Sequence, residues 1–327
     1  MSVIIQIDRT FIEEQTEFTG LVAEIHKAFY ENQMIVPKRH HHDFPNSVAT
    51  NDTTMLLMPA WNTGKSAGVK IVTVNPENDQ YQLPSIQGTY LYLDANTGVM
   101  KAIMEAKSLT VKRTAATSAL ASSFLSREDS NSLLMIGTGA LATNLIEAHA
   151  AVRPIEKVYV WGRNYEKAVA ICEALQDKKY QVTAIESISE KVSEVDIISC
   201  ATLSKTPLVL GHYLKAGQHI DLVGAYKPDM RESDDAAIIK ASVFLDTYQS
   251  GLHESGDIAI PLSSGLLYKE AIKADLFELC SATKKGRTSH SEITLFKSVG
   301  HAMEDLAAAD YYYKKTYKCL KRRIKTF

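Results

Sequence analysis

The stretch LLMIGTGALATN, from Leu133 to Asn144, holds two glycines and an alanine at the spacing Gly-x-Gly-x-x-Ala. An apolar run precedes them and a helical pattern follows, as in a strand that turns into a helix. There Gly137 would allow a tight bend, Gly139 a close approach to a pyrophosphate, and Ala142 close packing of helix on strand. The helix N-terminus would add free N–H groups for phosphates. The loop predicts a dinucleotide site; the alternative is an ordinary strand-to-helix turn.

The next strand, KVYVWGRN at 157–164, bears on which dinucleotide binds. An NAD site usually carries Asp or Glu at the end of this strand, where it binds the ribose 2′-hydroxyl. Here Gly162 and Arg163 stand at that place. Glycine leaves room for a 2′-phosphate, and arginine can hold it through charge-assisted hydrogen bonds of about 1.5–3 kcal/mol each. We therefore expect NADPH to bind better than NADH; the alternative is that Arg163 is a surface charge only.

Three cations in the N-terminal part could bind an anion together. Arg39 stands in VPKRHHH, Lys70 in GVKIVTV and Arg113 in LTVKRTAATSALA. Lys70 is the strongest signal, because a lysine within an apolar strand is costly unless it meets an anion. Arg113 is expected to open a helix that leads to the nucleotide-binding part. If the three converge they suit a substrate carboxylate, whereas singly each could be a surface or strand-edge charge.

Two kinds of element pattern must position these residues. The chain begins with a short strand and a helix over 16–33. Short β-rich runs then fill residues 34–117, with a hairpin signal at DANTG, which predicts a mostly antiparallel sheet. From residue 118 strands and helices alternate, which predicts parallel βαβ units. Residues 291–318 are expected to form one long helix.

The expected fold class is therefore α/β, with a Rossmann parallel-sheet domain inserted in a mostly antiparallel α+β domain. The Rossmann dinucleotide-binding domain should span 118–297. The substrate-binding and dimerisation domain should combine 1–117 with 298–327. The chain length of 327 residues suits two domains of ordinary size.

Composition excludes several classes of protein. The formal net charge of −2 argues against a general nucleic-acid binder. Four cysteines, at 172, 200, 280 and 319, show no CxxC spacing and fit a reducing compartment. The N-terminus does not resemble a signal peptide, and no run approaches the roughly 18 apolar residues of a membrane span. We expect a soluble cytoplasmic protein whose basic cluster, Lys314–Lys325, is the solvated face of the last helix.

Eight motifs together resemble the ornithine cyclodeaminase/mu-crystallin family. In chain order, over about residues 30 to 312, they are VPKR, MLLMPAW, GVKIVTVNPEN, LDANTG, LTVKRTAATSALA, IGTGALA, GAYKPDMRE and GRTSHSEITLFKSVGHAMEDLAAA. The resemblance implies a homodimer with an outer domain for dimerisation and substrate and an inner Rossmann domain. It also implies chemistry at the C–N bond of an amino or imino acid, with a nicotinamide cofactor.

The resemblance also implies roles for single residues. Arg39, Lys70 and Arg113 would bind the substrate carboxylate, and Lys70 could donate a proton if its cationic neighbours depress its pKa. The glycine loop and the resemblance together give the expected cofactor-binding residues: Thr114, Gly137, Thr138, Gly139, Ala140, Leu141, Ala142, Trp161, Gly162, Arg163, Asn164, Ala201, Thr202 and Gly224.

The segment VGAYKPDMRE separates the subfamilies. Cyclodeaminases and the related alanine dehydrogenase carry an aspartate where Tyr226 stands, and a tyrosine with a pKa near 10 is a poor base for water. The segment instead resembles ketimine reductase members, which implies reduction of delta1-pyrroline-2-carboxylate to L-proline, or of delta1-piperideine-2-carboxylate to L-pipecolate. Asp229 is expected to cap the following turn, with a catalytic role as the alternative.

Two further functions and two further motifs stay open. The functions are ornithine cyclodeamination, which releases ammonia, and non-catalytic NADPH binding as in a crystallin. The retained glycine loop and the three cations argue against the second. Adjacent histidines at 40–42 would point to alternating faces of a strand and make poor co-ligands, so no metal is expected. The loop HESGD, His253–Asp257, could be structural or catalytic.

Overall fold

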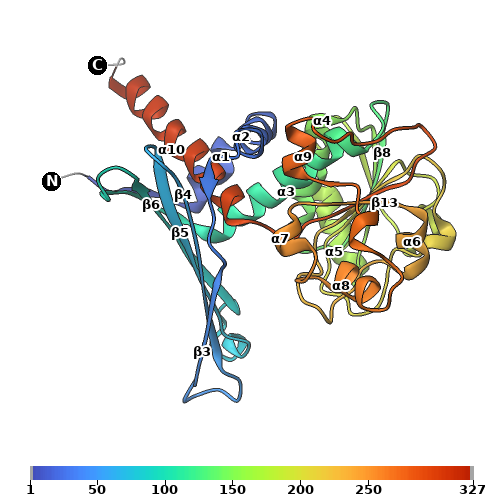
Figure 1. Ribbon diagram of the computed structural model, residues 1–327, viewed down its shortest axis with the longest axis horizontal. Helices are drawn as coiled ribbons and strands as arrows, with labels where there is room; N and C mark the ends of the chain where they lie inside the picture. The colour runs from blue at the N-terminus through green and yellow to red at the C-terminus, as the bar shows by residue number, and fades with distance from the viewer. Residues whose placement is uncertain (1–2, 325–327) are drawn as a thin grey trace. The chain divides into compact units, whose positions relative to one another are not determined.

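The computed structural model describes residues 3–324, with side chains described as far as Thr316. The chain divides into two compact units: unit 1 comprises Met1–Arg113 and Ala302–Phe327, and unit 2 comprises Thr114–His301. The inserted domain expected from the sequence begins four residues later, at 118 instead of 114, and ends four earlier, at 297 instead of 301. Figure 1 follows the chain through both units.

Unit 1 contains a seven-stranded sheet in the order β1-β7-β6-β5-β4-β2, with β3 also paired to β4. All its strand pairs are antiparallel except β1 with β7, as the short β-rich runs predict. The strands are β1 (Ile5–Ile7), β2 (Met34–Ile35), β3 (His40–Phe44), β4 (Thr53–Asn62), β5 (Ser66–Val74), β6 (Ile86–Asp94) and β7 (Met100–Glu105). The hairpin expected at DANTG joins β6 to β7.

Three helices of unit 1 accompany this sheet: α1 (Arg9–Gln15), α2 (Phe18–Glu31) and α10 (Ala302–Ile324). Helix α10 packs on β4 and β5, and α2 packs on α10. Helix α2 buries a stripe at helical spacing that includes Leu21, Ile25 and Phe29. It ends at Asn32, whose backbone is left-handed with φ 48°.

One row of side chains across the sheet defines its buried face. The strand register places Ile7, Met104, Tyr90, Lys70 and Met58 side by side on successive strands. All five are buried. Lys70 is the only cation in a row that is otherwise apolar or aromatic. The strand formed by GVKIVTV therefore places Lys70 on the buried face of the sheet.

Helix α3 (Ala106–Leu125) contains the boundary between the two units. It begins directly after β7, where the Glu105 carboxylate accepts the backbone N–H groups of Lys107 and Ser108, each at 2.8 Å. The expectation that Arg113 opens this helix is therefore wrong, because Arg113 lies about two turns inside it. The helix is rich in alanine and serine and is buried on most of its surface, so it shows no clear amphipathic stripe in the sequence.

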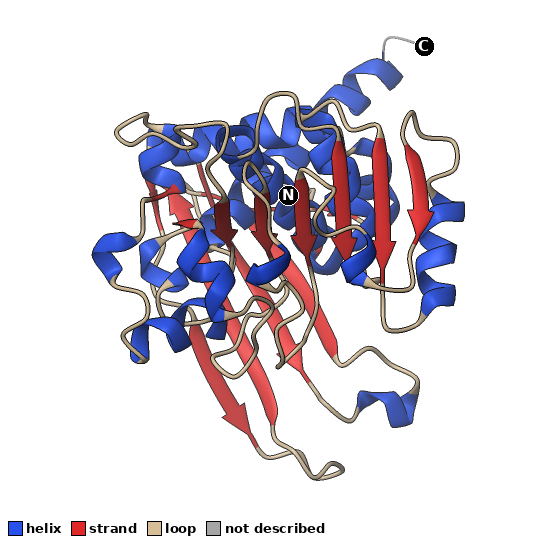
Figure 2. Cartoon of the chain, turned by 90° about the vertical axis from the view of Figure 1, so that its right-hand side faces the viewer, coloured by secondary structure: helices blue, strands red, loops and turns tan. Residues whose placement is uncertain are grey.

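Unit 2 contains an eight-stranded, fully parallel sheet in the order β10-β9-β8-β11-β12-β15-β13-β14 (Figure 2). The strands are β8 (Ser132–Ile136), β9 (Lys157–Trp161), β10 (Gln181–Ala184), β11 (Ile197–Cys200), β12 (His219–Leu222), β13 (Ser242–Leu245), β14 (Ala274–Asp275) and β15 (Thr294–Lys297). The helices are α4 (Ala142–Val152), α5 (Tyr165–Ala174), α6 (Asp235–Lys240), α7 (Tyr248–Gly251), α8 (Gly256–Ser263) and α9 (Leu276–Cys280). This is the doubly wound arrangement expected for the inserted domain.

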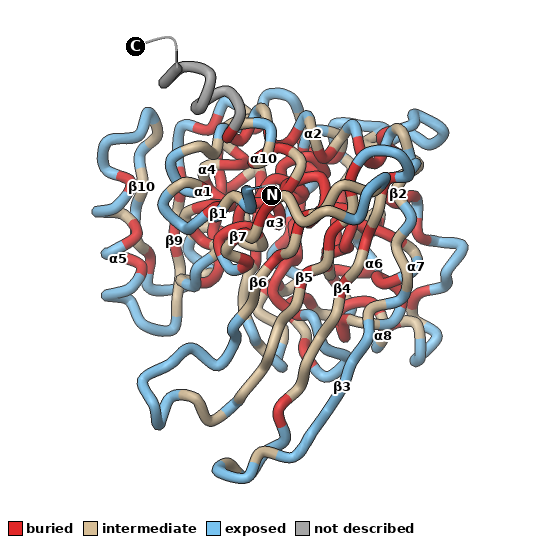
Figure 3. Tube along the Cα trace, turned by 90° about the vertical axis from the view of Figure 1, so that its left-hand side faces the viewer, coloured by how far each residue is buried: buried red, intermediate tan, exposed pale blue. Residues whose placement is uncertain are grey.

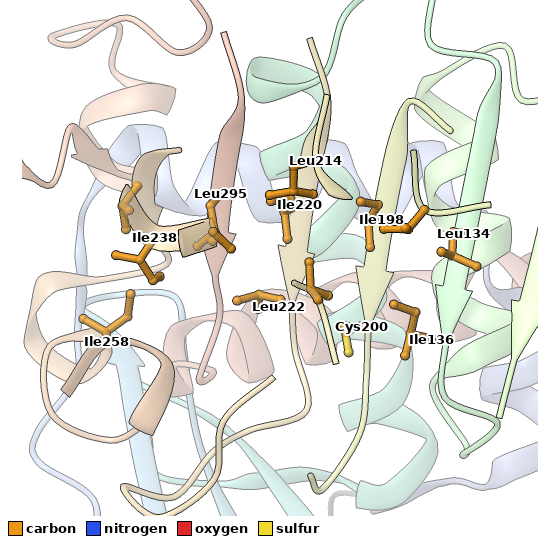
Figure 4. Close-up of a cluster of buried hydrophobic side chains, with 14 of the residues drawn as sticks. Leu134, Ile136, Ile198, Cys200, Leu214, Ile220, Leu222, Ile238, Ile258 and Leu295 are labelled. Atoms are coloured by element: carbon orange, nitrogen blue, oxygen red, sulfur yellow. The ribbon is translucent and has the colours of Figure 1, made fainter. Parts of the chain in front are cut away.

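The core of unit 2 lies on this sheet. Figure 4 shows buried side chains from neighbouring strands, among them Leu134, Ile198, Ile220 and Leu295. Strands buried on both faces read as continuous apolar runs rather than as alternating patterns. The strand segments SLLMI and IISC are such runs, and every residue in them is buried.

The expectation of one helix over 291–318 is wrong. Residues 294–297 form β15, which lies between β12 and β13, and α10 begins only at Ala302. All four residues of β15 are buried, so the segment TLFK has no exposed helical face. Gly300, with φ 84°, ends the extended segment before the helix.

Some sequence expectations concern the ends of the chain and its thiols. No helix in the described part of the chain is long and apolar enough to span a membrane. Cys172, Cys200 and Cys280 are free thiols, and the side chain of Cys319 lies outside the described residues. In the basic cluster Lys314 pairs with Glu24 and Lys315 with Glu17; side chains beyond Thr316 lie outside the description.

Candidate functional site

Unit 1 brings two of the three predicted cations together. Lys70 Nζ lies 2.7 Å from Asp305 Oδ2 and 3.4 Å from the Thr110 hydroxyl. Arg113 Nε donates to Asp305 Oδ1 at 2.9 Å, and its Nη1 donates to Glu304 Oε2 at 2.5 Å. We call these four residues, Lys70, Arg113, Glu304 and Asp305, the cation–carboxylate cluster. Three elements build it: strand β5, helix α3 and the first turn of α10.

The cation–carboxylate cluster is buried, so its charges are shielded from water and act strongly on one another. The side chains of Glu304 and Asp305 are fully buried, and those of Lys70 and Arg113 almost so. Sequence reasoning identified the cations and missed both carboxylates, although they stand in the quoted motif GHAMEDLAAA. An anion was required in principle, because a buried ammonium without a partner is costly. The contact between β5 and a helix more than 200 residues later cannot be read from a single sequence.

Burial lowers the pKa of Lys70 to about 8, against an ordinary 10.5. Asp305 opposes this change, whereas Arg113 and Arg39 add to it. The cationic neighbours thus contribute to the lowered pKa, as expected, but burial is the larger cause. Arg39 lies between β2 and β3 and is partly buried, and its positive charge contributes to the lowered pKa of Lys70. An amine with a pKa near neutrality can both bind an anion and exchange a proton.

The pKa values of Asp305 and Arg113 shift in the directions that favour the charged form of each group. Burial disfavours a charged carboxylate at Asp305, but Lys70 and Arg113 outweigh it and lower the pKa of Asp305. Burial likewise disfavours the charge on Arg113, but Asp305 and Glu304 outweigh it and raise the pKa of Arg113. Asp305 and Arg113 therefore stay charged at neutral pH, and of these three groups Lys70 titrates closest to neutral pH.

In unit 2 the glycine loop has the geometry of a phosphate-binding turn. Gly137 follows β8 with φ 115°, and a Cβ there would lie 2.5 Å from the Ala201 carbonyl oxygen. A Cβ on Gly139 would meet nothing within 4 Å. Ala142 opens α4 and is buried, and Leu141 at its N-cap gives no side-chain cap. The turn therefore requires glycine at 137, leaves open space at 139, and presents an N-terminus without a side-chain cap.

The second predicted feature lies at the end of β9. A Cβ on Gly162 would lie 2.5 Å from Thr138 Cγ2, so glycine is needed here for packing against the loop as well. Arg163 is exposed, and within the described residues it forms no ion pair. Asn164 caps α5 by accepting the Lys167 N–H at 3.1 Å, and Trp161 donates its indole N–H to the Glu186 carbonyl. Of these residues, Arg163 is the one with an exposed cationic side chain.

The loops after β11 and β12 meet at a buried carboxylate that sequence reasoning missed. Glu232 accepts from the backbone N–H and hydroxyl of Thr202 and from the backbone N–H groups of Gly224 and Ala225. Burial raises the pKa of Glu232, while Lys297 opposes the change. Glu232 stands in the motif GAYKPDMRE, where the sequence alone singles out Tyr226 and Asp229.

The HESGD loop, His253–Asp257, begins with an exposed residue and ends with a buried one. Asp257 is fully buried, accepts the backbone N–H groups of Glu232 and Ser233, and lies 3.2 Å from Lys297 Nζ. His253 is exposed. Asp257 thus supports the backbone at Glu232 and Ser233 within unit 2.

The remaining candidates lie at exposed positions, apart from Thr114. Tyr226 follows β12 and is exposed. Asp229 pairs with Lys205 at 2.7 Å rather than capping the following turn, so that expectation is wrong. The histidines at 40–42 lie in β3, which is exposed along its length (Figure 3). Thr114 is buried in α3.

Comparisons with known proteins agree with these arrangements. The model of the ornithine cyclodeaminase/mu-crystallin family matches residues 6–319. The chain is 38% identical over 259 residues to the delta(1)-pyrroline-2-carboxylate reductase of Paracoccus denitrificans, covering 79% of this chain and 82% of that protein.

Solved structures give the same picture. The delta(1)-pyrroline-2-carboxylate reductase of Thermococcus litoralis, in complex with NADH and L-proline, superposes with a TM-score of 0.89 at 33% identity, covering 96% of this chain and 98% of that one. An archaeal alanine dehydrogenase dimer with bound NAD reaches a TM-score of 0.87 at 25% identity, with 96% of each chain covered. The chain belongs to the ornithine cyclodeaminase/mu-crystallin family.

Proposed function

We propose that this protein is a nicotinamide-dependent oxidoreductase that reduces the C=N bond of a cyclic ketimine carboxylate. The substrate we favour is delta1-pyrroline-2-carboxylate, which gives L-proline, with delta1-piperideine-2-carboxylate as the six-membered alternative. The observation that carries the proposal is the buried placement of Lys70 and Arg113 in the cation–carboxylate cluster. Relatives named as such reductases, and the similar structure with NADH and L-proline, support it.

The substrate carboxylate is proposed to bind at Lys70, Arg113 and Arg39. An ammonium has three N–H donors; among the described residues, Asp305 and Thr110 take two of those of Lys70. One donor is thus available to a substrate. Holding the carboxylate also fixes the adjacent imine carbon, because both belong to one planar unit. Such positioning removes much of the entropic cost of the reaction.

The imine nitrogen must gain a proton as the carbon gains a hydride. Lys70, with a pKa of about 8, is largely protonated at pH 7 and is a proton donor of suitable strength. A nicotinamide cofactor, when bound, supplies the hydride. The residues proposed to hold it are the turn Gly137–Ala142 and the loops at Ala201, Thr202 and Gly224. The left-handed Gly137 and the open space at Gly139 fit such a group.

We propose that NADPH is preferred over NADH. The support is the exposed guanidinium of Arg163 beside Gly162, without a carboxylate at the end of β9. Arg163→Ala should raise the Michaelis constant for NADPH at least tenfold, which corresponds to about 1.4 kcal/mol, and leave that for NADH unchanged. Lys167→Ala, an exposed cation in α5, is the matched control. Equal losses with both cofactors would refute the assignment.

A substrate panel tests the function itself. Purified protein is mixed with NADPH or NADH and with the five- and six-membered cyclic imines, pyruvate plus ammonia, or ornithine. We expect absorbance at 340 nm to fall with the cyclic imines and no ammonia to appear from ornithine. Ammonia release from ornithine without net oxidation of NADPH would instead identify a cyclodeaminase. Binding of NADPH without turnover of any substrate would identify a binding protein.

We also propose a homodimer formed through unit 1 and a cytoplasmic location. The family resemblance supports the first, and the free thiols at Cys172, Cys200 and Cys280 support the second. Light scattering after gel filtration should give about twice the chain mass of 36.2 kDa. A mass equal to one chain at micromolar concentration would contradict the dimer.

A further inference from the structure

One buried carboxylate fastens two loops of unit 2. Glu232 Oε1 accepts from the Thr202 backbone N–H at 2.6 Å and from its hydroxyl at 2.9 Å. Glu232 Oε2 accepts from the backbone N–H groups of Gly224 at 2.8 Å and Ala225 at 3.1 Å. Thr202 belongs to the loop after β11, and Gly224 and Ala225 to the loop after β12. These strands are neighbours in the parallel sheet, so Glu232 ties together the ends of two adjacent strands.

Steric contacts join the same loops to the glycine turn. A Cβ on Gly224 would overlap the backbone nitrogen and oxygen of Thr202. A Cβ on Gly137 would lie 2.5 Å from the Ala201 carbonyl oxygen. The turn after β8 and the loops after β11 and β12 are therefore in close backbone contact. A displacement of the Thr202 loop would therefore also displace the glycine turn after β8 and the loop after β12.

Glu232 is itself held in place. Asp257 Oδ1 accepts the backbone N–H of Glu232 at 2.8 Å and that of Ser233 at 3.0 Å. Lys297 Nζ, in β15, lies 3.2 Å from Asp257 and 3.7 Å from Glu232. All three charged side chains are fully buried. The ammonium compensates part of the two negative charges, so the cluster supports a fixed position for the Glu232 carboxylate.

We propose that Glu232 is a positioning residue for the cofactor, which holds the loops after β11 and β12 in the conformation that receives the nicotinamide half of the dinucleotide. Ligands of doubly wound sheets lie at the carboxyl ends of the strands, at the point where strand order reverses. Here β8 lies between β9 and β11. The β9 side carries the ribose-binding position, so the β11 side receives the other half. This inference rests on the cofactor site of the proposed function.

The experiment replaces the carboxylate without changing its shape. In Glu232→Gln the amide nitrogen becomes a donor that faces the N–H groups of one loop. The dissociation constant for NADPH, measured by nicotinamide fluorescence, should rise at least tenfold, or about 1.4 kcal/mol. The Michaelis constant for the cyclic imine at saturating NADPH should stay within twofold. Glu232→Asp keeps the charge beside Lys297 but is too short to reach both loops. If Glu232→Gln does not fold, Glu232→Asp should likewise raise the dissociation constant for NADPH and leave the Michaelis constant for the imine within twofold.

Asp196 offers a matched control at the other end of the same strand. Its carboxylate accepts the backbone N–H groups of Asn131 at 2.9 Å and Ser132 at 3.1 Å. It stands directly before β11, whereas Thr202 follows β11. Asp196→Asn should therefore lower the melting temperature while changing the dissociation constant for NADPH less than twofold.

The outcomes separate the possibilities. Weaker NADPH binding in the Glu232 variants, but not in Asp196→Asn at a similar loss of melting temperature, supports the positioning role. Unchanged NADPH binding in the Glu232 variants, or equal weakening in the Asp196 variant, overturns it. If the unmodified protein reduces the imine with NADPH, such a result leaves the proposed function intact. An unmodified protein that binds no nicotinamide dinucleotide would overturn the cofactor site and this inference together.

Discussion

Removing the negative charge of Asp305 should shift the pH dependence of catalysis. Asp305 Oδ2 lies 2.7 Å from Lys70 Nζ and raises the pKa of that amine against the effect of burial. In Asp305→Asn the ammonium of Lys70 loses this support, so it should release its proton at a lower pH. If protonated Lys70 binds the carboxylate and protonates the imine, kcat/KM falls with the loss of that proton. The alkaline limb of the profile should therefore move to lower pH.

The size of the shift follows from the buried contact. A hydrogen bond to a charged group contributes about 1.5–3 kcal/mol, and 1.36 kcal/mol corresponds to one pH unit. The alkaline limb, which we expect near pH 8 in the unmodified protein, should fall by about one to two pH units. At pH 7 the protonated fraction of Lys70 would then drop from about nine-tenths to between about one-half and one-tenth.

The assay measures kcat/KM for the cyclic imine between pH 5.5 and 9.5 at saturating NADPH, at constant ionic strength. Ionisation of the free imine also affects such profiles, but it is identical for both proteins and cancels in the comparison. Amine-specific labelling of Lys70, followed by mass spectrometry at each pH, gives a readout that needs no turnover. Melting temperatures show whether Asp305→Asn remains folded at each pH.

Two results would show that Lys70 and Asp305 do not set the alkaline limb as proposed. An unchanged alkaline limb in a folded Asp305→Asn protein would show that Lys70 does not control it. A limb that moves while the labelling profile of Lys70 stays fixed would assign the titration to another group. Glu304→Gln serves as the comparison, because Glu304 pairs with Arg113, whereas Asp305 pairs with Lys70 directly; its effect on the limb should be the smaller one.

Three further predictions concern both units. Gly137→Ala should abolish NADPH binding, because φ 115° disfavours a side chain and the Cβ would meet Ala201; isothermal titration measures this. Arg113→Lys should lower kcat/KM for the imine at least tenfold, because an ammonium cannot bond Glu304 and Asp305 in the same forked geometry; steady-state kinetics measures it. Ile220→Ala should destabilise the fold by about 2–5 kcal/mol, because Ile220 is fully buried in the core of unit 2; urea denaturation measures it.

Local patterns were sufficient for most of the fold. The apolar runs before the glycine loop and after it predicted the parallel strands, because such strands are buried on both faces. The antiparallel sheet followed from short strands and the DANTG turn. The segment 294–297 was misassigned because four buried residues before a long helix have no period of their own. Its place between β12 and β13 depends on contacts far away in sequence.

The candidate site was predictable in its cations and not in its anions. Lys70 stood out because its strand is otherwise apolar, and the structure places it in a buried row. Asp305 and Glu232 stood in quoted motifs, but a charged residue at a helix start or in a loop usually faces solvent. Only the tertiary fold shows that they are fully buried and bonded. The residues that hold a site in place are therefore harder to predict than those that contact its ligand.

Transfer of deuterium tests directly whether the protein passes a hydride from NADPH to the imine carbon. The protein is incubated with delta1-pyrroline-2-carboxylate and NADPH that carries deuterium at the transferable C4 position, and the product is analysed by NMR and mass spectrometry. We expect L-proline with one deuterium at the α-carbon for each NADPH consumed, and none of this product with Lys70→Ala, which should still bind NADPH. Proline without deuterium, or full transfer by Lys70→Ala, would contradict the proposed role of Lys70 and of the cofactor.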